Sequence, residues 1–277
     1  MMFDRFLSVF SLVSRIPVIG RFKFDLSRID FYLPLIGIFP AFLGLISCFL
    51  ALWLTGLALF SVTAALFVQY LCFNLFHLDG LADTADAFLG TVSREKRFAI
   101  LKDSRIGVYG FFAGVFAFIF KLSLLYGLLR GINGVFFNIS PERLLVFIYP
   151  VSGRFGAALV PCMAAPAKPE GLGALAAKSR ASFALAGTVS ALLICLSLWL
   201  AAASIFAEVP DTHSLLIILL CYFVVPLLAG LISAVFYTRV YGKALGGYSG
   251  DALGAAIETA EILFLFFVAV LYNFFAV

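Results

Sequence analysis

The chain alternates long uncharged stretches with short segments that hold most of its charge. A membrane-spanning helix needs about 20 apolar residues, and residues 31–76 contain no charged residue. This stretch is too long for one span, and Thr55-Gly56 offers a turn between two spans. The same length criterion predicts further spans at residues 107–129, 143–163, 182–207, 214–237 and 256–277. The pattern therefore predicts seven transmembrane helices.

The composition supports this interpretation. Of the 277 residues, 64% are hydrophobic and 12% are charged, whereas a soluble domain is about 45–50% apolar and about 25% charged. A water-soluble fold and a disordered chain are both excluded. Partnership with nucleic acid is excluded as well, because the basic residues form no clustered stripe. We expect an all-α, polytopic helical bundle in the lipid bilayer, with residues 1–277 forming a single membrane-embedded domain.

The segment of residues 1–30 mixes charges with short apolar pieces and has no continuous apolar core of a signal peptide. The spacing of Phe3, Phe6, Leu7 and Phe10 indicates an amphipathic helix lying at the membrane interface.

The basic residues predict the orientation of the bundle. Four groups of basic residues lie before the first span and after the second, fourth and sixth spans, so that these groups share one side. The connection around Glu208, Asp211 and His213 contains no Lys or Arg. By the positive-inside rule, the N-terminus is cytoplasmic.

A stripe of carboxylates follows the second span. Asp79, Asp83 and Asp86 are spaced i, i+4, i+7 and share an arc of about 60° on a helix. No cationic residue lies within a turn of them, so a divalent cation is needed to offset their repulsion, and oxygen ligands suit Mg²⁺. The alternative is a solvated helix end. We favour a metal or substrate site, because ionisable groups at membrane depth usually serve function.

A basic loop leads into the third span. Lys102 and Arg105, together with backbone N–H groups at a helix start, form a cradle for phosphate. The alternative is a basic anchor beside the membrane. Asp103 favours the functional interpretation, since a pure anchor has no use for an acid.

A glycine-rich turn opens the last helix. Asp251, Glu258 and Glu261 then share an arc of about 80°. Exposing either glutamate to lipid would cost about 2.5–3.5 kcal/mol at mid-bilayer, so we expect both to face the bundle interior, toward Asp79. Asp251 also suits a helix N-cap. Arg154, inside the fourth span, requires a carboxylate or phosphate partner for the same reason.

At these residues the chain resembles the cobalamin-5′-phosphate synthase family, the adenosylcobinamide-GDP ribazoletransferases. The matching motifs run in order along the whole chain, and HLDGLADT together with DSR-G are the most specific. They are Arg15-Ile-Pro-Val18, Leu33-Pro-Leu-Ile-Gly37, Phe76-His-Leu-Asp-Gly-Leu-Ala-Asp-Thr-Ala-Asp86, Lys102-Asp-Ser-Arg-Ile-Gly107, Glu170-Gly-Leu-Gly173 and Gly250-Asp-Ala-Leu-Gly-Ala-Ala-Ile-Glu258.

The resemblance implies a reaction in which α-ribazole, or its 5′-phosphate, joins adenosylcobinamide-GDP. The products are adenosylcobalamin, or its 5′-phosphate, and GMP, in a late step of nucleotide-loop assembly. It also implies Mg²⁺ dependence and a place in the cytoplasmic (inner) membrane of a prokaryote, with the active site on the cytoplasmic side. Whether the chain forms a homo-oligomer or associates with other cobalamin-assembly enzymes stays open.

Spacing and resemblance together assign roles to the candidate residues. Asp79, Asp83 and Asp86 are the expected Mg²⁺ ligands, and Glu258 or Glu261 completes the shell. Asp86 is also the hypothetical acceptor of the hydroxyl proton. The catalytic set is Asp79, Asp83, Asp86 and Glu258, and the substrate-binding set is His77, Lys102, Asp103, Ser104, Arg105, Arg154 and Asp251.

Two alternatives remain. A cation- or proton-coupled transporter would use intramembrane carboxylates, but it predicts inverted repeats that the sequence does not display. A non-catalytic corrinoid-binding membrane protein would not need the acidic stripes.

Overall fold

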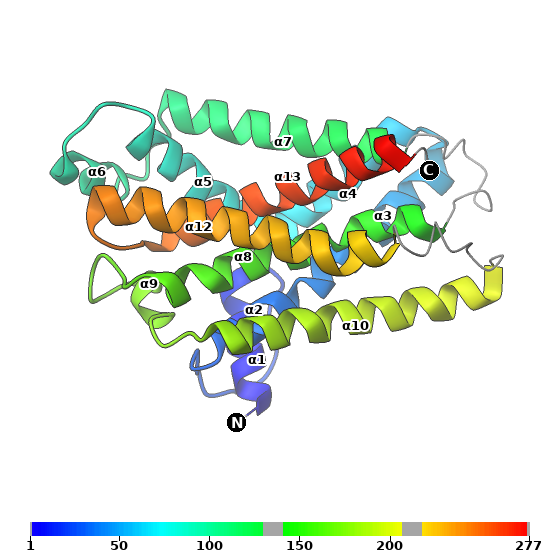
Figure 1. Cartoon of the computed structure of the whole chain (residues 1–277), viewed down its shortest axis with the longest axis horizontal. Coiled ribbons are helices and arrows are strands. Elements are labelled where there is room, and N and C mark those ends of the chain that lie inside the picture. Colours follow the sequence, from blue (N-terminus) through cyan, green and yellow to red (C-terminus); the bar gives the residue numbers. More distant parts are fainter. Residues whose placement is uncertain (1, 130–140, 207–217, 276–277) are drawn as a thin grey trace.

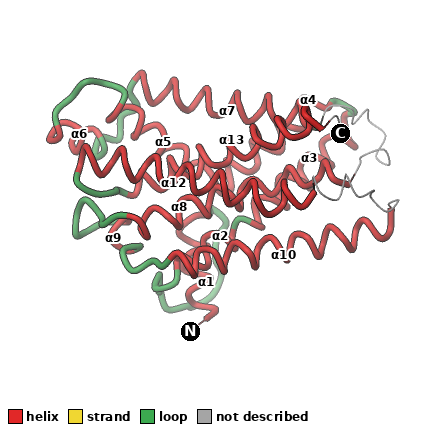
Figure 2. Tube along the Cα trace, in the orientation of Figure 1, coloured by secondary structure: helices red, strands yellow, loops and turns green. Residues whose placement is uncertain are grey.

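Every regular element of the part of the chain that the structure describes is a helix (Figures 1 and 2). The computed structural model describes residues 2–129, 141–206 and 218–275. Seven segments are long and apolar enough to cross a membrane, which confirms the all-α bundle and the predicted number of spans. The segments are Ile29–Thr55, Ala58–Phe88, Val108–Leu128, Leu144–Met163, Ala181–Ala201, Leu220–Leu245 and Gly250–Phe274. The connection around Glu208, Asp211 and His213 lies outside the described residues.

The predicted turn between the first two spans is confirmed. Helix α3 (Ile38–Thr55) ends at Gly56, whose φ of 67° is left-handed and favours glycine. The first span also contains α2 (Ile29–Ile36). The second span is built from α4 (Ala58–Gln69), a π-helical turn η1 (Tyr70–Asn74) and α5 (Leu75–Phe88). A π-turn inside a helix often marks a functional region, and here it directly precedes the aspartate stripe.

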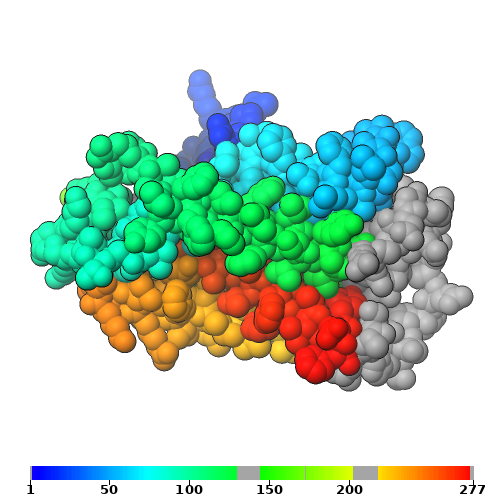
Figure 3. Space-filling view, turned by 90° about the horizontal axis from the view of Figure 1, so that it is seen from above, coloured from blue at the N-terminus to red at the C-terminus, as the bar shows by residue number. Residues whose placement is uncertain are grey.

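Helix α8 (Tyr149–Met163) lies at the centre of the bundle. Of its spanning window, 94% is buried, against 22% for α7 (Val108–Leu128). Around α8 pack α13 (Gly250–Phe275), α12 (Val225–Leu245) and α10 (Ala181–Phe206). The space-filling view shows α7 (green) lying along α13 (red) (Figure 3). Helix α7 also packs against α5 and α4, and most of the rest of its surface is exposed.

The last two helices are longer at their shared connection than the apolar pattern predicts. Helix α12 continues from the expected end at residue 237 to Leu245, and it carries Arg239 and Lys243 in its last turns. Helix α13 begins at Gly250, ahead of the apolar span that starts at residue 256, which confirms that the glycine-rich turn opens the last helix. Helix α12 extends beyond the apolar window because Tyr241 and Leu245 are still fully buried against neighbouring elements.

The short elements gather at one end of the bundle, on the left in Figure 1. This end, called the loop end below, holds α6 (Arg94–Ile100), α9 (Leu172–Leu175) and the connection from α12 to α13. The N-terminal helix α1 (Met2–Val13) packs on α2. Its Val9 and Val13 are buried while Phe3 is exposed, so the helix is confirmed, and its position at the membrane interface stays a prediction.

Candidate functional site

The aspartate stripe lies where α5 crosses α13 at close range. A methyl group added to Gly80 would lie 3.0 Å from the Asp251 carbonyl oxygen, and one added to Gly254 would lie 2.9 Å from the His77 carbonyl oxygen. Only glycines allow the two backbones to approach so closely. The crossing therefore sets Asp251, in the first turn of α13, beside the stripe on α5.

These carboxylates face one another without a cation among them. Asp83 has Asp79, Asp251 and Asp86 as its charged neighbours, all of the same sign. In the described ranges, the Asp79 and Asp83 carboxylates form no hydrogen bond or ion pair, and Asp251 accepts one hydrogen bond, from the Ser249 hydroxyl at 3.0 Å. Asp79 is exposed, while Asp83 and Asp251 are half-buried. The group has the charge and the accessibility to attract a cation from solution.

Asp86 has a different environment from the other members of the stripe. Its carboxylate accepts the backbone N–H of Gly107 at 2.7 Å and that of Gly110 at 2.9 Å. These N–H groups open α7, so Asp86 caps this helix from a distance in sequence and meets the positive end of its dipole. A methyl group on either glycine would collide with the carboxylate. The expected roles of Asp86 as a metal ligand and proton acceptor stay predictions.

Glu258 and Glu261 lie inside the bundle, as their cost in lipid predicts, but they meet cations there. The Lys121 ammonium on α7 lies 2.7 Å from Glu258 and also pairs with Glu261. The Arg154 guanidinium on α8 lies 3.3 Å from Glu261. All four side chains are fully buried. Two negative and two positive charges therefore form a neutral group, called the buried quartet below.

The π-turn η1 completes the coordination of the buried quartet. The Tyr70 hydroxyl donates to Glu258 at 2.8 Å, and the Asn74 amide donates to Glu261 at 3.1 Å. The Asn74 carbonyl oxygen accepts from Arg154 at 3.2 Å. Sequence reasoning required a partner for Arg154, and the structure supplies Glu261. It missed Lys121, although a single lysine in an otherwise apolar span has the same need for an acid.

His77 lies between the two groups of charges. It is 2% exposed, and its Nδ1 atom has no hydrogen-bond partner in the described residues. Arg154 and Lys121 are its cationic neighbours. The structure therefore places His77 beside the buried quartet, and the backbone of His77 contacts Gly254 at the crossing.

The basic loop after α6 holds the remaining predicted substrate-binding residues. Arg105 donates to Asp103 through two nitrogens, at 2.9 and 2.6 Å, and this hydrogen bonding lowers the pKa of the Asp103 carboxyl to about 2. Ser104 and Lys102 are exposed. Arg105 thus already has an anionic partner on the surface, whereas Lys102 opens onto a hollow.

This loop-end hollow contains about 480 Å³ of open space. Its walls come from three segments that are distant in the sequence: α6 with the following loop, residues 166–174, and the turn that starts α13. Asp251 belongs to its wall and is also a neighbour of Asp83. The hollow and the aspartate stripe are therefore contiguous.

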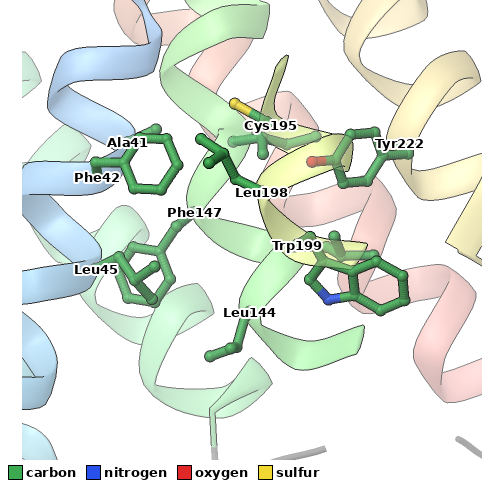
Figure 4. A pocket seen from close by; sticks show the side chains of 11 residues that line it. Ala41, Phe42, Leu45, Leu144, Phe147, Cys195, Leu198, Trp199 and Tyr222 are labelled. Atoms are coloured by element: carbon green, nitrogen blue, oxygen red, sulfur yellow. The ribbon is translucent and has the colours of Figure 1, made fainter. Parts of the chain in front are cut away.

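A second hollow, of about 530 Å³, lies among α3, α10 and the 3-10 helical segment Pro141–Ile148 that precedes α8 (Figure 4). Phe42, Phe147 and Trp199 are among the side chains that surround it. Cys195, Trp199 and Tyr222 are the lining residues whose side chains carry a sulfur, nitrogen or oxygen atom. It offers no carboxylate, histidine or cation for chemistry on a phosphate.

Within the described residues, no three His, Cys, Asp or Glu side chains are arranged to share one metal ion. Asp79, Asp83, Asp86 and Asp251 lie together. Glu258 and Glu261 instead form ion pairs with Lys121 and Arg154. Mg²⁺ is commonly held by one or two carboxylates together with water and substrate phosphates. The exposed aspartates fit such an open site better than the enclosed glutamates do.

Comparison with known proteins identifies relatives along most of the chain. The family model described as cobalamin-5-phosphate synthase matches residues 5–269. An adenosylcobinamide-GDP ribazoletransferase of Escherichia coli (strain K12) is 32% identical over 208 residues, which cover 73% of each chain. The enzymes of the same name from Shigella boydii and Treponema denticola are 32% and 33% identical over 206 and 190 residues; these cover 73% and 68% of this chain and 73% and 67% of the relatives. No solved structure gives a significant match.

Proposed function

The chain belongs to the cobalamin-5-phosphate synthase family, and from this premise we propose that it is an adenosylcobinamide-GDP ribazoletransferase. It joins α-ribazole, or α-ribazole 5′-phosphate, to adenosylcobinamide-GDP and releases GMP. Family membership over residues 5–269 is the observation that carries this proposal. It favours the transferase over the cation- or proton-coupled transporter and over a non-catalytic corrinoid-binding protein.

The reaction exchanges one phosphoester oxygen for another. A ribose hydroxyl of the ribazole forms a bond to the phosphorus next to cobinamide, and the bond from this phosphorus to the oxygen of GMP breaks. The hydroxyl proton leaves to a base or to water, and GMP departs with the negative charge. Catalysis of such a transfer requires positioned reactants and neutralised phosphate oxygens.

The aspartates at the crossing suit this requirement. We assign Mg²⁺ to Asp79 and Asp83, with Asp251 beside them, because the Asp79 and Asp83 carboxylates form no ion pair within the described residues. When bound, Mg²⁺ neutralises charge on the attacking and departing oxygens. The Gly80–Gly254 contact holds the two helices so that these carboxylates stay on one face.

The buried quartet has a positioning role in this proposal. Lys121 and Arg154 hold Glu258 and Glu261 through short contacts on α13. These ties fix α13 against α7 and α8, and thereby fix Asp251 relative to α5. Glu258 and Glu261 then support the metal site from inside the bundle instead of ligating the ion.

The site lies on the cytoplasmic side of the inner membrane in this proposal. The residues of the loop end include Arg94, Lys102, Lys168 and Lys243, and by the positive-inside rule such an end is cytoplasmic. Soluble substrates would reach Asp79 from that side. The relatives named above are bacterial, which agrees with a prokaryotic inner membrane.

A reconstituted assay tests the proposal. The purified protein in nanodiscs is supplied with adenosylcobinamide-GDP, α-ribazole or its 5′-phosphate, and Mg²⁺, and GMP and the corrinoid product are quantified by chromatography and mass spectrometry. We expect equal amounts of both products, loss of both with a chelator, and recovery when Mg²⁺ is restored. Absence of product from both ribazole substrates would reject the proposed activity. Product formation that continues in the presence of the chelator would reject the proposed dependence on Mg²⁺.

A further inference from the structure

We propose that Lys168, together with Lys102, forms the subsite in the loop-end hollow that binds the diphosphate of a nucleoside-diphosphate substrate. Lys168 is not part of the basic loop after α6. It lines the hollow from the connection between α8 and α9. The nature of this ligand rests on the proposed function, whereas the presence of an anion subsite rests on the geometry alone.

The first argument is the placement of two like charges side by side. Lys102 is the neighbouring cation that acts most strongly on Lys168, and both line the hollow. Neither ammonium forms an ion pair with any residue of the described ranges. Desolvation and then repulsion from Lys102 lower the pKa of Lys168. Two adjacent unpaired ammonium groups are stabilised when an anion with several oxygens lies between them.

The second argument is that the segment carrying Lys168 is held firmly. The Ala167 N–H donates to the Tyr248 carbonyl at 2.7 Å, and the Tyr248 N–H donates to the Ala165 carbonyl at 3.1 Å. The Tyr248 hydroxyl donates to the Gly173 carbonyl at 2.7 Å, and this tyrosine is 1% exposed. These bonds fasten the loop to the turn that starts α13, so the loop position does not depend on a bound ligand.

The Lys168 side chain itself is also oriented. Its ammonium lies 4.4 Å from the centre of the Phe98 ring, and the Arg94 guanidinium lies 5.9 Å from the same centre. A cation over an aromatic face is favoured by about 0.5–1 kcal/mol at an exposed site. Lys168 is therefore held over the hollow without being neutralised, which leaves its charge for a ligand.

The third argument is the continuity with the aspartates. Asp251 lines the hollow and interacts electrostatically with both Lys168 and Asp83. A diphosphate ester bound by the two lysines would thus extend along Asp251 toward the aspartate stripe. Because cations lie at one end of the hollow and carboxylates at the other, the site favours a diphosphate bound with a divalent ion over a simple monoanion.

The test combines binding and kinetics on the full chain in nanodiscs. GDP is the binding probe, titrated in the presence of Mg²⁺ by calorimetry, and KM and kcat for adenosylcobinamide-GDP are measured separately from KM for α-ribazole. We expect Lys168→Ala to weaken GDP binding and to raise KM for adenosylcobinamide-GDP about tenfold, since a hydrogen bond to a charged group is lost. KM for α-ribazole stays unchanged, and Lys168→Arg keeps most of the affinity. Lys178→Ala, an exposed lysine that does not line the hollow, is the matched control.

The outcomes separate this inference from the proposed function. GDP binding that depends on Lys168 in a protein that forms no corrinoid product supports the subsite and rejects the transferase. A fully active transferase in which Lys168→Ala leaves both the GDP affinity and KM at the wild-type values overturns the subsite. An equal loss in Lys178→Ala and Lys168→Ala also overturns it, because the effect then reflects only the net charge of the surface.

Discussion

The Lys121 ammonium lies 2.7 Å from the Glu258 carboxylate, deep within the bundle and remote in sequence. Both side chains are fully buried, and the ammonium also pairs with Glu261. Lys121 is on α7, which otherwise exposes apolar residues such as Phe112 and Phe116. One inward lysine thus fastens a lipid-facing helix to the helix that carries Asp251.

We predict that Lys121→Met strongly destabilises the protein. Removing one partner leaves an uncompensated negative charge in the buried quartet, and breaking such a pair costs about 3–5 kcal/mol. The double variant Lys121→Met/Glu258→Gln removes the charge on both sides and is expected to melt closer to the wild type than the single variant. Thermal unfolding in detergent measures both.

The control for these unfolding measurements is the variant Phe120→Leu, at the residue next to Lys121. Phe120 is 50% exposed, and a substitution on such a surface changes stability by about 0.5 kcal/mol or less. A wild-type melting temperature for Lys121→Met would show that the buried quartet does not stabilise the fold.

The crossing of α5 and α13 gives a second prediction. Gly254→Ala places a methyl group 2.9 Å from the His77 carbonyl oxygen, so the helices must separate. We expect lower thermal stability and a larger fall in the rate of GMP release, because Asp251 moves relative to Asp83. Gly127→Ala in α7 is the control, since a methyl group there meets no atom within 4 Å. Retention of full activity by Gly254→Ala would mean that the spacing of the carboxylates is not critical.

Much of the fold could be predicted from the sequence because the bilayer imposes a simple rule. Uncharged stretches of sufficient length must be helices, and the seven spans follow. The glycine-rich turn before Asp251 also predicts the start of α13. The end of α12 could not be predicted in this way. Beyond the apolar window its extent depends on the packing of Tyr241 and Leu245, and packing between distant segments leaves no local pattern in the chain.

The sequence predicted which acidic residues gather, but it predicted neither Lys121 nor the ion pairs that the buried charges form. Helical spacing correctly grouped Asp79, Asp83 and Asp86 on α5, and the cost of charge in lipid predicted inward glutamates. The same spacing could not tell which cations Glu258 and Glu261 would meet, because Lys121 and Arg154 come from other helices. The two acidic clusters therefore differ in environment although their sequence patterns are similar.

A third prediction concerns the metal. We expect Asp79→Asn and Asp83→Asn each to lower Mg²⁺-dependent GMP release about a hundredfold or more, since a bound metal supplies several kcal/mol of charge stabilisation. Thermal stability should stay the same or rise, because each substitution relieves repulsion among like charges. Glu95→Gln, an exposed acid on α6, is the matched control. Full Mg²⁺-dependent activity of both aspartate variants in liposomes would refute the metal assignment.

Asp86 gives the last prediction, because its capping role and its expected metal role have different signatures. Asp86→Ala removes the acceptor of the Gly107 and Gly110 N–H groups, and each unmet donor costs about 1–3 kcal/mol. Asp86→Asn retains one acceptor oxygen and should lie between the alanine variant and the wild type in melting temperature. If capping is its whole role, both variants keep the wild-type concentration of Mg²⁺ at half-maximal activity, measured well below their melting temperatures. A shift of that concentration in a stably folded Asp86→Asn would assign Asp86 to the metal as well.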